Sequence, residues 1–392
     1  MKRRTFVKLS LLSPLFLKTA CIQQKGGRIH RYLNADSRRF EMLEVSGSYY
    51  DIGYSSGKTF SKNIRSIVKS RQDWIQSLLA VTDSKSGRKY SEALLSESRK
   101  HFPHIVEEIE GIADGCGYSF DFLWMMSIQS ELNAYQKENP GCSTIYYRDT
   151  KHNWLAHNED GDTSYSGKMY ILKAHPPSGV SYITLVYPGI IEGLGPSFNS
   201  YGMVETTNFI GCNKPEVGVP RYLLGRAILE SKNMEEALQI ATFQPRAFPW
   251  HHNLGSCQTR EYVSIETLPD GTVDIRRPSG VYIHTNHTTG ETTKNYKHQD
   301  LDYANTSSIT RYNVLTKKKE NTTQPIVNSR EILNWLSSRE GKPYSPCRIP
   351  EGNITGETLG TALFDLNNAT MRLYKGFPAK ALPNNYYTDY KF

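Results

Sequence analysis

The most informative part of this sequence is residues 140–160, which read PGCSTIYYRDTKHNWLAHNED. Two runs rich in aromatic and β-branched residues flank a polar segment at residues 149–151, a pattern that predicts two antiparallel strands joined by a turn. With the turn centred on that segment, Cys142 lies opposite Asn158, and Asp160 falls just beyond the partner strand. This hairpin is therefore expected to bring a thiol within reach of a carboxylate.

A carboxylate does not activate a neighbouring thiol, because its negative charge disfavours the thiolate. It would instead suit a nearby cation, such as a free α-amine. An α-amine exists at Cys142 only if the chain is cut between Gly141 and Cys142. The pattern therefore raises the possibility that this cysteine becomes a new N-terminus.

The residues before this hairpin are mostly helical in pattern. Apolar residues recur near helical spacing between Phe60 and Leu79, which predicts an amphipathic helix of several turns. A second helical stretch, over Tyr90–Glu110, is expected to end at the glycine-rich segment 111–117.

After the hairpin the pattern changes to short strands separated by turn residues, with two helical inserts. The helices are expected at Met234–Ala241, after the capping residue Asn233, and from Asn328 to Gly341. The order of helices, strands, helices and strands predicts one compact α+β domain, with an antiparallel sheet sandwiched between helices. The further strands are expected at Met169–Ala174, Tyr182–Tyr187, Tyr262–Thr267, Thr272–Arg276, Thr358–Phe364 and Thr370–Tyr374.

Charge argues against a nucleic-acid partner. The 392 residues include 47 Lys and Arg and 39 Asp and Glu, for a formal net charge of +8. Five of the basic residues and none of the acids lie in residues 1–20, so the remainder is nearly balanced. No broad phosphate-binding surface is implied by that balance.

The first 21 residues have the features of an export signal. A basic start precedes the apolar stretch Leu9–Leu17, which is too short for a permanent membrane span. The sequence Arg3–Lys8 resembles a twin-arginine signal, and Thr19-Ala20-Cys21 resembles the end of a lipoprotein signal. We expect the twin-arginine machinery to export the protein from a bacterial cytoplasm to the periplasm or cell surface, with a lipid anchor on Cys21. An ordinary cleaved secretory signal is the alternative.

No metal site or cofactor is expected. The six cysteines form no C-x-x-C pair, which argues against a structural zinc site. The histidine pairs at 251–252 and at 284 and 287 lack a third carboxylate or thiolate partner at suitable spacing. Export would permit disulfides, but the sequence does not reveal their pairing.

Several short motifs in a fixed order resemble the acyl-coenzyme A:6-aminopenicillanic acid acyltransferase family. This family is a branch of the N-terminal-nucleophile hydrolases and is related to bile-salt hydrolases and penicillin V acylases. The resemblance covers roughly residues 45–380. The motifs are G-C-S-T, N-E-D, Y-P-G (Tyr187–Gly189), F-N-S-x-G (Phe198–Gly202), G-V-P-R (Gly218–Arg221), H-T-N-H (His284–His287) and T-S-S-x-x-R (Thr306–Arg311).

The resemblance implies a four-layer αββα fold and self-cleavage between Gly141 and Cys142. After the export signal at residues 1–21, residues 22–141 would form a helical α fragment. Residues 142–392 would form a β fragment of the same compact domain. The freed thiol of Cys142 would be the nucleophile and its own α-amine the base.

The resemblance also implies roles for four other residues. Asp160 matches an aspartate that holds the amine or the substrate, and Asn286 matches an oxyanion-hole donor. Asn208, in T-T-N-F, matches a second asparagine beside the site. Arg311 matches an arginine near the nucleophile, where it would lower the pKa of the thiol. His157 is a departure, because bile-salt hydrolases carry an arginine there, so a bile-salt-like substrate is not implied.

These observations predict a self-processing cysteine amidohydrolase or acyltransferase that forms an acyl-enzyme. Its substrate would be an N-acyl small molecule, a thioester or a peptide. Transfer of the acyl group to an amine, in place of hydrolysis, is one alternative. A non-catalytic, lipid-anchored binding protein of the same fold is the other.

Overall fold

The computed structural model describes residues 26–33, 37–132, 141–299, 304–352, 354–378 and 387–391. Cys21 and the predicted export signal lie outside these residues. Within the described ranges, no helix is long and apolar enough to cross a membrane.

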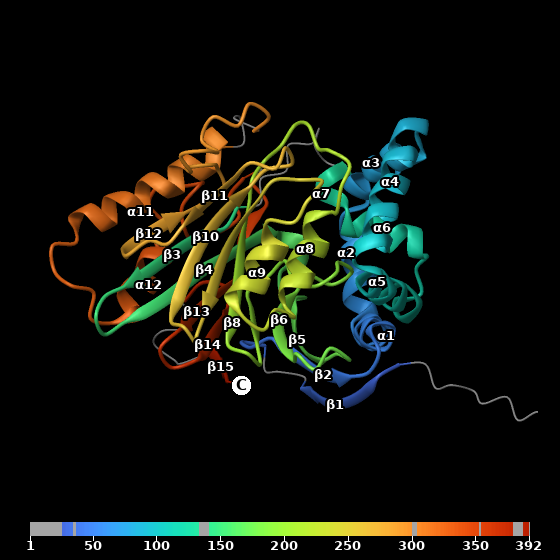
Figure 1. Cartoon of the computed structure of the whole chain (residues 1–392), viewed down its shortest axis with the longest axis horizontal. Helices are drawn as coiled ribbons and strands as arrows, with labels where there is room; N and C mark the ends of the chain where they lie inside the picture. The colour runs from blue at the N-terminus through green and yellow to red at the C-terminus, as the bar shows by residue number, and fades with distance from the viewer. Residues whose placement is uncertain are drawn as a thin grey trace, which may run out of the picture.

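Two β-sheets form the centre of the molecule (Figure 1). The larger sheet has nine strands in the order β1-β2-β5-β6-β7-β8-β9-β10-β11, and the smaller has six in the order β12-β3-β4-β13-β14-β15. The strands of the larger sheet are β1 (Arg28–Leu33), β2 (Glu41–Ser46), β5 (Tyr170–His175), β6 (Tyr182–Val186), β7 (Ser197–Asn199), β8 (Met203–Phe209), β9 (Trp250–Ser256), β10 (Glu261–Thr267) and β11 (Val273–Arg276). Those of the smaller sheet are β12 (Gly280–His284), β3 (Ser143–Arg148), β4 (Asn153–Asp162), β13 (Gly356–Asp365), β14 (Thr370–Lys375) and β15 (Tyr387–Tyr390).

The helices divide into two groups on opposite sides of these sheets (Figure 1). The first group packs on the larger sheet and comprises α1 (Tyr49–Thr59), α2 (Ser61–Ser70), α3 (Gln72–Asp83), α4 (Lys85–His101), α5 (Pro103–Cys116), α6 (Phe120–Ser127), α7 (Gln129–Leu132), α8 (Arg221–Ile228) and α9 (Met234–Ala241). The second group comprises α11 (Ile309–Asn321) and α12 (Ser329–Leu336).

Three apolar interfaces hold the layers together. Side chains alternate between the two faces of the larger sheet along β5. Leu172 packs toward α1, and its neighbour Ile171 faces the smaller sheet. Between the sheets, the rings of Tyr146 and Tyr262 stack with centroids 4.0 Å apart. The outer face of the smaller sheet packs against α11 and α12 through a cluster that includes Leu336. This arrangement confirms the expected α+β fold with helix, sheet, sheet and helix layers.

Most strand predictions are confirmed, but the larger sheet is not purely antiparallel. Strands β2 and β5 pair in parallel, from Glu41 opposite Tyr170 to Ser46 opposite His175. The intervening chain forms helices α1 to α7 and the β3–β4 hairpin, and β5 runs in the same direction as β2. The segment before Gly141 also contains strands β1 and β2 and is not wholly helical.

Several helix boundaries differ from the prediction. The stretch Tyr90–Glu110 is divided between α4 and α5, and the helix expected from Asn328 to Gly341 ends at Leu336. The segment from Phe60 to Leu79 is broken at Arg71, which separates α2 from α3. Helix α5 continues through Gly111 to Cys116 and ends at Gly117, whose φ of 80° is in the left-handed region. Gly111 therefore lies inside a helix, where the absence of a side chain lets α5 approach the backbone of α1 closely.

Candidate active site

The β3–β4 hairpin differs from its predicted register by one residue. A four-residue loop joins Arg148 to its partner Asn153, and Ser143 pairs with Asn158. The carboxylate of Asp149 closes this loop by accepting the backbone N–H groups of residues 151 and 152. Because loop length sets the register of a hairpin, the prediction that Cys142 lies opposite Asn158 was wrong. The residue opposite Cys142 is Glu159.

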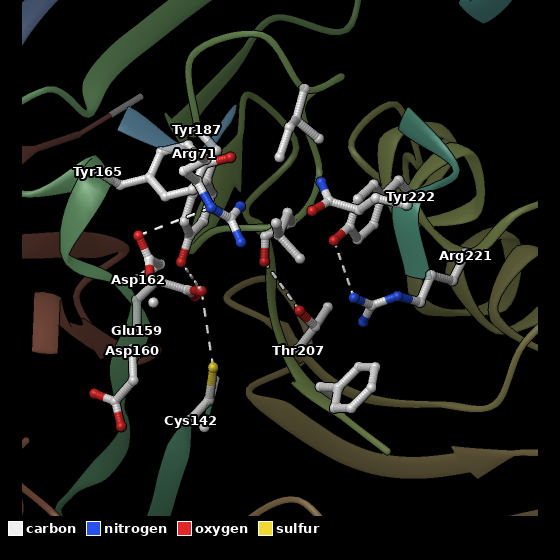
Figure 2. Close-up of a pocket in the computed structure, with 16 residues that line it drawn as sticks. Arg71, Cys142, Glu159, Asp160, Asp162, Tyr165, Tyr187, Thr207, Arg221 and Tyr222 are labelled. Atoms are coloured by element: carbon white, nitrogen blue, oxygen red, sulfur yellow. Dashed lines mark hydrogen bonds and ion pairs between the residues drawn. The ribbon is translucent and has the colours of Figure 1, made fainter. Parts of the chain in front are cut away.

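Glu159 is the carboxylate nearest to the thiol in this hairpin, and the sequence analysis missed it. Its Oε1 lies 3.7 Å from Sγ of Cys142 and accepts a 2.6 Å hydrogen bond from the hydroxyl of Tyr187 (Figure 2). Its Oε2 lies 3.2 Å from Nε2 of His157, two residues earlier on the same face of β4. The alternation of β4 combined with the correct loop length would have identified Glu159.

The thiol of Cys142 is buried in the uncut chain. Burial raises the pKa of this thiol well above its ordinary value, and the negative charges of Glu159 and Asp160 raise it further. The positive charge of Arg311 opposes this shift, as the sequence predicted, but does not overcome it. In this arrangement the sulfur is therefore a protonated thiol at neutral pH.

The backbone of Cys142 is held on both sides by buried side chains. Its N–H donates to Oδ1 of Asn286 over 2.8 Å, and its carbonyl oxygen accepts from Nη1 of Arg311 over 2.5 Å. Nη2 of Arg311 also donates to Oδ1 of Asn286 over 2.7 Å. Two residues expected at the site are thus brought together at Cys142, Asn286 from the segment after β12 and Arg311 from α11.

Gly141 lies against the guanidinium group of Arg311. A Cβ atom at this position would collide with that group and lie 3.3 Å from Nη1 of Arg348. A side chain before Cys142 would therefore displace the same arginine that binds the Cys142 carbonyl.

Asp160 lines the same pocket as Cys142 but bonds to a different strand. Its Oδ1 accepts a 2.7 Å hydrogen bond from Thr358, next to a bulge in β13, while its Oδ2 is buried without a partner among the described residues. Burial raises the pKa of Asp160 to about 7, although Arg311, Arg348 and Thr358 oppose the shift. Oδ2 is thus available to a hydrogen-bond donor inside the pocket.

Of the two asparagines, Asn286 contacts Cys142 and Asn208 bonds to other residues. Oδ1 of Asn208 accepts from Thr144 over 2.9 Å and from Asn253 over 2.9 Å, which places this amide between the sheets, beside Thr144. The amide nitrogen of Asn286 donates to the carbonyl of Phe209, so its oxygen faces Cys142. An oxyanion role for Asn286 would require this amide to turn.

One described group of side chains has the geometry to hold a metal ion. Cys142, His157 and Glu159 offer ligand atoms within 4.8 Å of one another. The histidines considered in the sequence are engaged elsewhere, since His251 stacks on His284 and bonds to Ser264. The five cysteines in the described ranges are all free, so no disulfide joins them.

The pocket at Cys142 has about 590 Å³ of empty space. In Figure 2, Cys142, Glu159 and Asp160 lie on one side of it, and Arg221 and Tyr222 lie on the other. Between them the wall includes the apolar side chains of residues 190, 194 and 209. The arrangement offers a thiol, two carboxylates and an apolar surface that a small acyl compound can contact.

Comparisons with known proteins found a matching family model and a similar curated protein. The model of the family "Acyl-coenzyme A:6-aminopenicillanic acid acyl-transferase" matches residues 147–380. The beta-alanyl-dopamine/carcinine hydrolase of Drosophila melanogaster is 24% identical over 384 residues, which cover 88% of this chain and 94% of that protein.

Two solved structures are also similar to this chain. One is a Caenorhabditis elegans ortholog of N-acylethanolamine-hydrolyzing acid amidase, with 11% identity, a TM-score of 0.36 and coverage of 58% of this chain and 93% of that chain. The other is a mutant conjugated bile acid hydrolase from Clostridium perfringens, with 11% identity, a TM-score of 0.36 and coverage of 64% and 97%.

Proposed function

Because this chain belongs to the acyl-coenzyme A:6-aminopenicillanic acid acyl-transferase family, we propose that it is a self-processing cysteine amidohydrolase. Membership confirms the resemblance found in the sequence motifs. It identifies an enzyme of the hydrolase or acyltransferase class. The identity of the nucleophile, the self-cleavage and the acyl-enzyme are our proposals.

The observation that carries the proposal is the way in which buried groups surround the bond between Gly141 and Cys142. Asn286 and Arg311 hold the backbone of Cys142 on either side, and the thiol lies beside Glu159. A Cβ atom at residue 141 would collide with the guanidinium group of Arg311. A peptide bond held in a fixed position next to a thiol and a base is well placed for an intramolecular acyl shift.

We propose the following self-cleavage. The thiol of Cys142 gives its proton to Glu159 and attacks the carbonyl carbon of Gly141. The carbon–nitrogen bond breaks as the nitrogen takes that proton, which leaves Gly141 as a thioester on Sγ and frees the α-amine. Water then hydrolyses the thioester and releases residue 141 as a carboxylate.

Cleavage also changes the electrostatics of the nucleophile. The new α-ammonium group would belong to the same residue as the thiol, whose pKa is raised by the carboxylates of Glu159 and Asp160 in the uncut chain. A positive charge there lowers the pKa of the thiol and offsets those carboxylates. In the mature enzyme the neutral form of the α-amine takes the thiol proton, and Sγ attacks the substrate carbonyl. The amide carbon–nitrogen bond breaks as the α-ammonium group gives that proton to the leaving amine. Water then hydrolyses the acyl-enzyme and releases the acid and the free thiol.

The substrate we propose is an N-acyl amine or a small peptide. The Drosophila relative is named for hydrolysis of a beta-alanyl amide, which supports amide cleavage as the primary activity. Transfer to an amine in place of water is the alternative, as the family name indicates. Product analysis with added amine separates the two, because excess acylated amine over free acid would identify a transferase.

Intact mass under denaturing conditions tests self-processing. We expect the wild-type protein to give two chains, the larger spanning residues 142–392, and Cys142→Ala to remain whole. Cys257→Ala, a half-buried cysteine outside the pocket, is the matched control and should be cut like the wild type. An uncut wild-type chain that still hydrolyses amides would contradict the proposed α-amine base.

We also propose export by the twin-arginine machinery and a lipid anchor on Cys21. The basic pair Arg3-Arg4 and the sequence Thr19-Ala20-Cys21 support both. Replacing Arg3 and Arg4 by lysine should leave the protein in the cytoplasm. Cys21→Ala should release it from the membrane fraction, and a Cys21→Ala protein that stays membrane-bound would contradict the anchor.

A further inference from the structure

The side of the pocket opposite Cys142 contains a buried arginine. Arg221 begins α8, and its side chain is buried with 5% of the residue exposed. Its guanidinium group lies 4.5 Å from the ring centroid of Tyr222, 4.7 Å from that of Phe209 and 5.0 Å from that of Trp250. These rings fix the position of the positive charge.

The hydrogen bonds of Arg221 leave one end of its guanidinium group unused. Nε donates to Ser130 over 2.8 Å, and Nη2 donates to the hydroxyl of Tyr222 over 3.0 Å. Nη1 is buried and has no hydrogen-bond partner among the described residues. Glu131 accepts from the backbone N–H of Arg221 over 2.9 Å, and its carboxylate attracts the guanidinium charge without making a hydrogen bond to Nη1.

A buried cationic donor without a partner is costly, and a guanidinium group is suited to bind a carboxylate with two parallel hydrogen bonds. Arg221 lines the pocket, and Figure 2 shows its side chain extending into the pocket from the side opposite Glu159. The unused donor is therefore placed where a substrate can reach it.

We propose that Arg221 binds a carboxylate on the substrate. The proposal deepens the proposed function and rests on it, since the same pocket holds Cys142. The apolar residues Ile190, Leu194 and Phe209 line the pocket together with both groups. The substrate class is therefore an N-acyl compound with an apolar portion and a carboxylate on one side of the scissile amide.

The carboxylate can belong to the acyl group or to the amine that leaves. Two pairs of probes distinguish these sources. Glutaryl-4-nitroanilide and valeryl-4-nitroanilide differ by a carboxylate on the acyl side. Hexanoylglycine and hexanoylglycinamide differ by a carboxylate on the amine side.

The test is kcat/KM for the four probes with wild-type enzyme, Arg221→Gln and Arg221→Lys. We expect the wild type to prefer the carboxylated member of one pair by at least tenfold. Arg221→Gln should lose that preference while it changes turnover of the neutral member less than threefold, and Arg221→Lys should keep part of it. Arg277→Gln, an exposed arginine outside the pocket, should behave like the wild type.

Equal turnover within both pairs by the wild type, or a preference that survives in Arg221→Gln, would overturn the proposal. A calorimetric titration with glutarate and with glutaramide covers the case in which Arg221→Gln does not fold. Wild-type protein should bind glutarate at least tenfold more tightly than glutaramide. Equal affinity for the two compounds would refute the carboxylate site at Arg221. Because this titration requires no turnover, it separates failure of the carboxylate site from failure of the proposed hydrolase activity.

Discussion

At the scale of single residues, the proposed self-cleavage would add a positive charge at Cys142. In the uncut chain the sulfur lies beside two carboxylates, and the pKa of its thiol is raised. The proposed cut adds an ammonium group to the same buried space. One reaction would thus create both the base and the favourable electrostatics of the nucleophile.

Asp160 should make stability fall as the pH rises. Its pKa is about 7 in the folded chain against an ordinary 3.8, so the folded state favours the protonated form. That contribution is fully present below about pH 4 and is lost as the pH rises through 7, a difference on the order of a few kcal/mol. Between pH 4.5 and pH 7.5, the urea midpoint of the Cys142→Ala protein should therefore fall more than that of the double variant Cys142→Ala/Asp160→Asn. An equal change in urea midpoint for the two proteins would contradict the raised pKa of Asp160.

Gly141→Ala should slow self-cleavage without unfolding the protein. The added methyl group would displace the Arg311 guanidinium, which holds the Cys142 carbonyl. We expect the rate of appearance of the two chains to fall at least tenfold, about 1.4 kcal/mol in the barrier. Gly179→Ala, at a remote turn with a φ of 79° and open space, strains the backbone but should leave the cleavage rate unchanged. A normal cleavage rate in Gly141→Ala would contradict the proposed role of Arg311 in holding the Cys142 carbonyl.

The sequence allowed prediction of which residues gather at Cys142, but not of how each is oriented. Arg311 and Asn286 were expected there from their motifs, and the structure places both in contact with Cys142. Glu159 was missed because a single loop residue changes which side chain of β4 lies opposite Cys142. Asn208 bonds instead to Thr144, a placement that depends on how the two sheets pack.

At the scale of elements, helices α1 and α5 pack through glycine. A Cβ on Gly53 or Gly57 of α1 would collide with the backbone of α5, and one on Gly111 or Gly115 of α5 would collide with the backbone of α1. The sequence suggested that the glycines after residue 110 end a helix. Their real function depends on a partner helix that local sequence does not reveal.

Gly111→Ala should therefore destabilise the protein, against the usual trend. In an open helix this change adds up to about 1 kcal/mol of stability. Here the methyl group would push α5 away from α1, at a cost of roughly 1–3 kcal/mol. Chemical denaturation of the variant and the wild type gives the sign directly. A gain in stability would show that the two helices separate without cost.

At the scale of the whole molecule, the fold joins chain from both sides of the proposed cut. Strand β2, before residue 141, pairs with β5 after it. Glu108 of α5 forms a buried 2.9 Å ion pair with Arg226 of α8. The layered α+β class followed from the order of helices and strands, whereas the parallel β2–β5 pair did not, because its partners are more than 120 residues apart.

The two chains of the processed enzyme should therefore stay together in native buffer. We expect a single peak of the combined mass in size-exclusion chromatography, and separate chains only in denaturant. Glu108→Gln leaves Arg226 without its main buried counter-charge, which costs about 3–5 kcal/mol, and should lower the denaturant concentration at which the chains separate. A β fragment that elutes alone from native wild-type protein would contradict this interlocked arrangement.

The pairing of β2 with β5 has a practical consequence for engineering. Since the two sides of the cut meet as neighbouring strands, the gene can be divided at codon 142 and the halves expressed as two open reading frames. Bacterial aminopeptidase removes an initiator methionine that precedes cysteine, so the second product would begin directly with Cys142. Assembly of those halves would supply mature enzyme from mutants that no longer process themselves, and would allow catalysis to be studied apart from maturation.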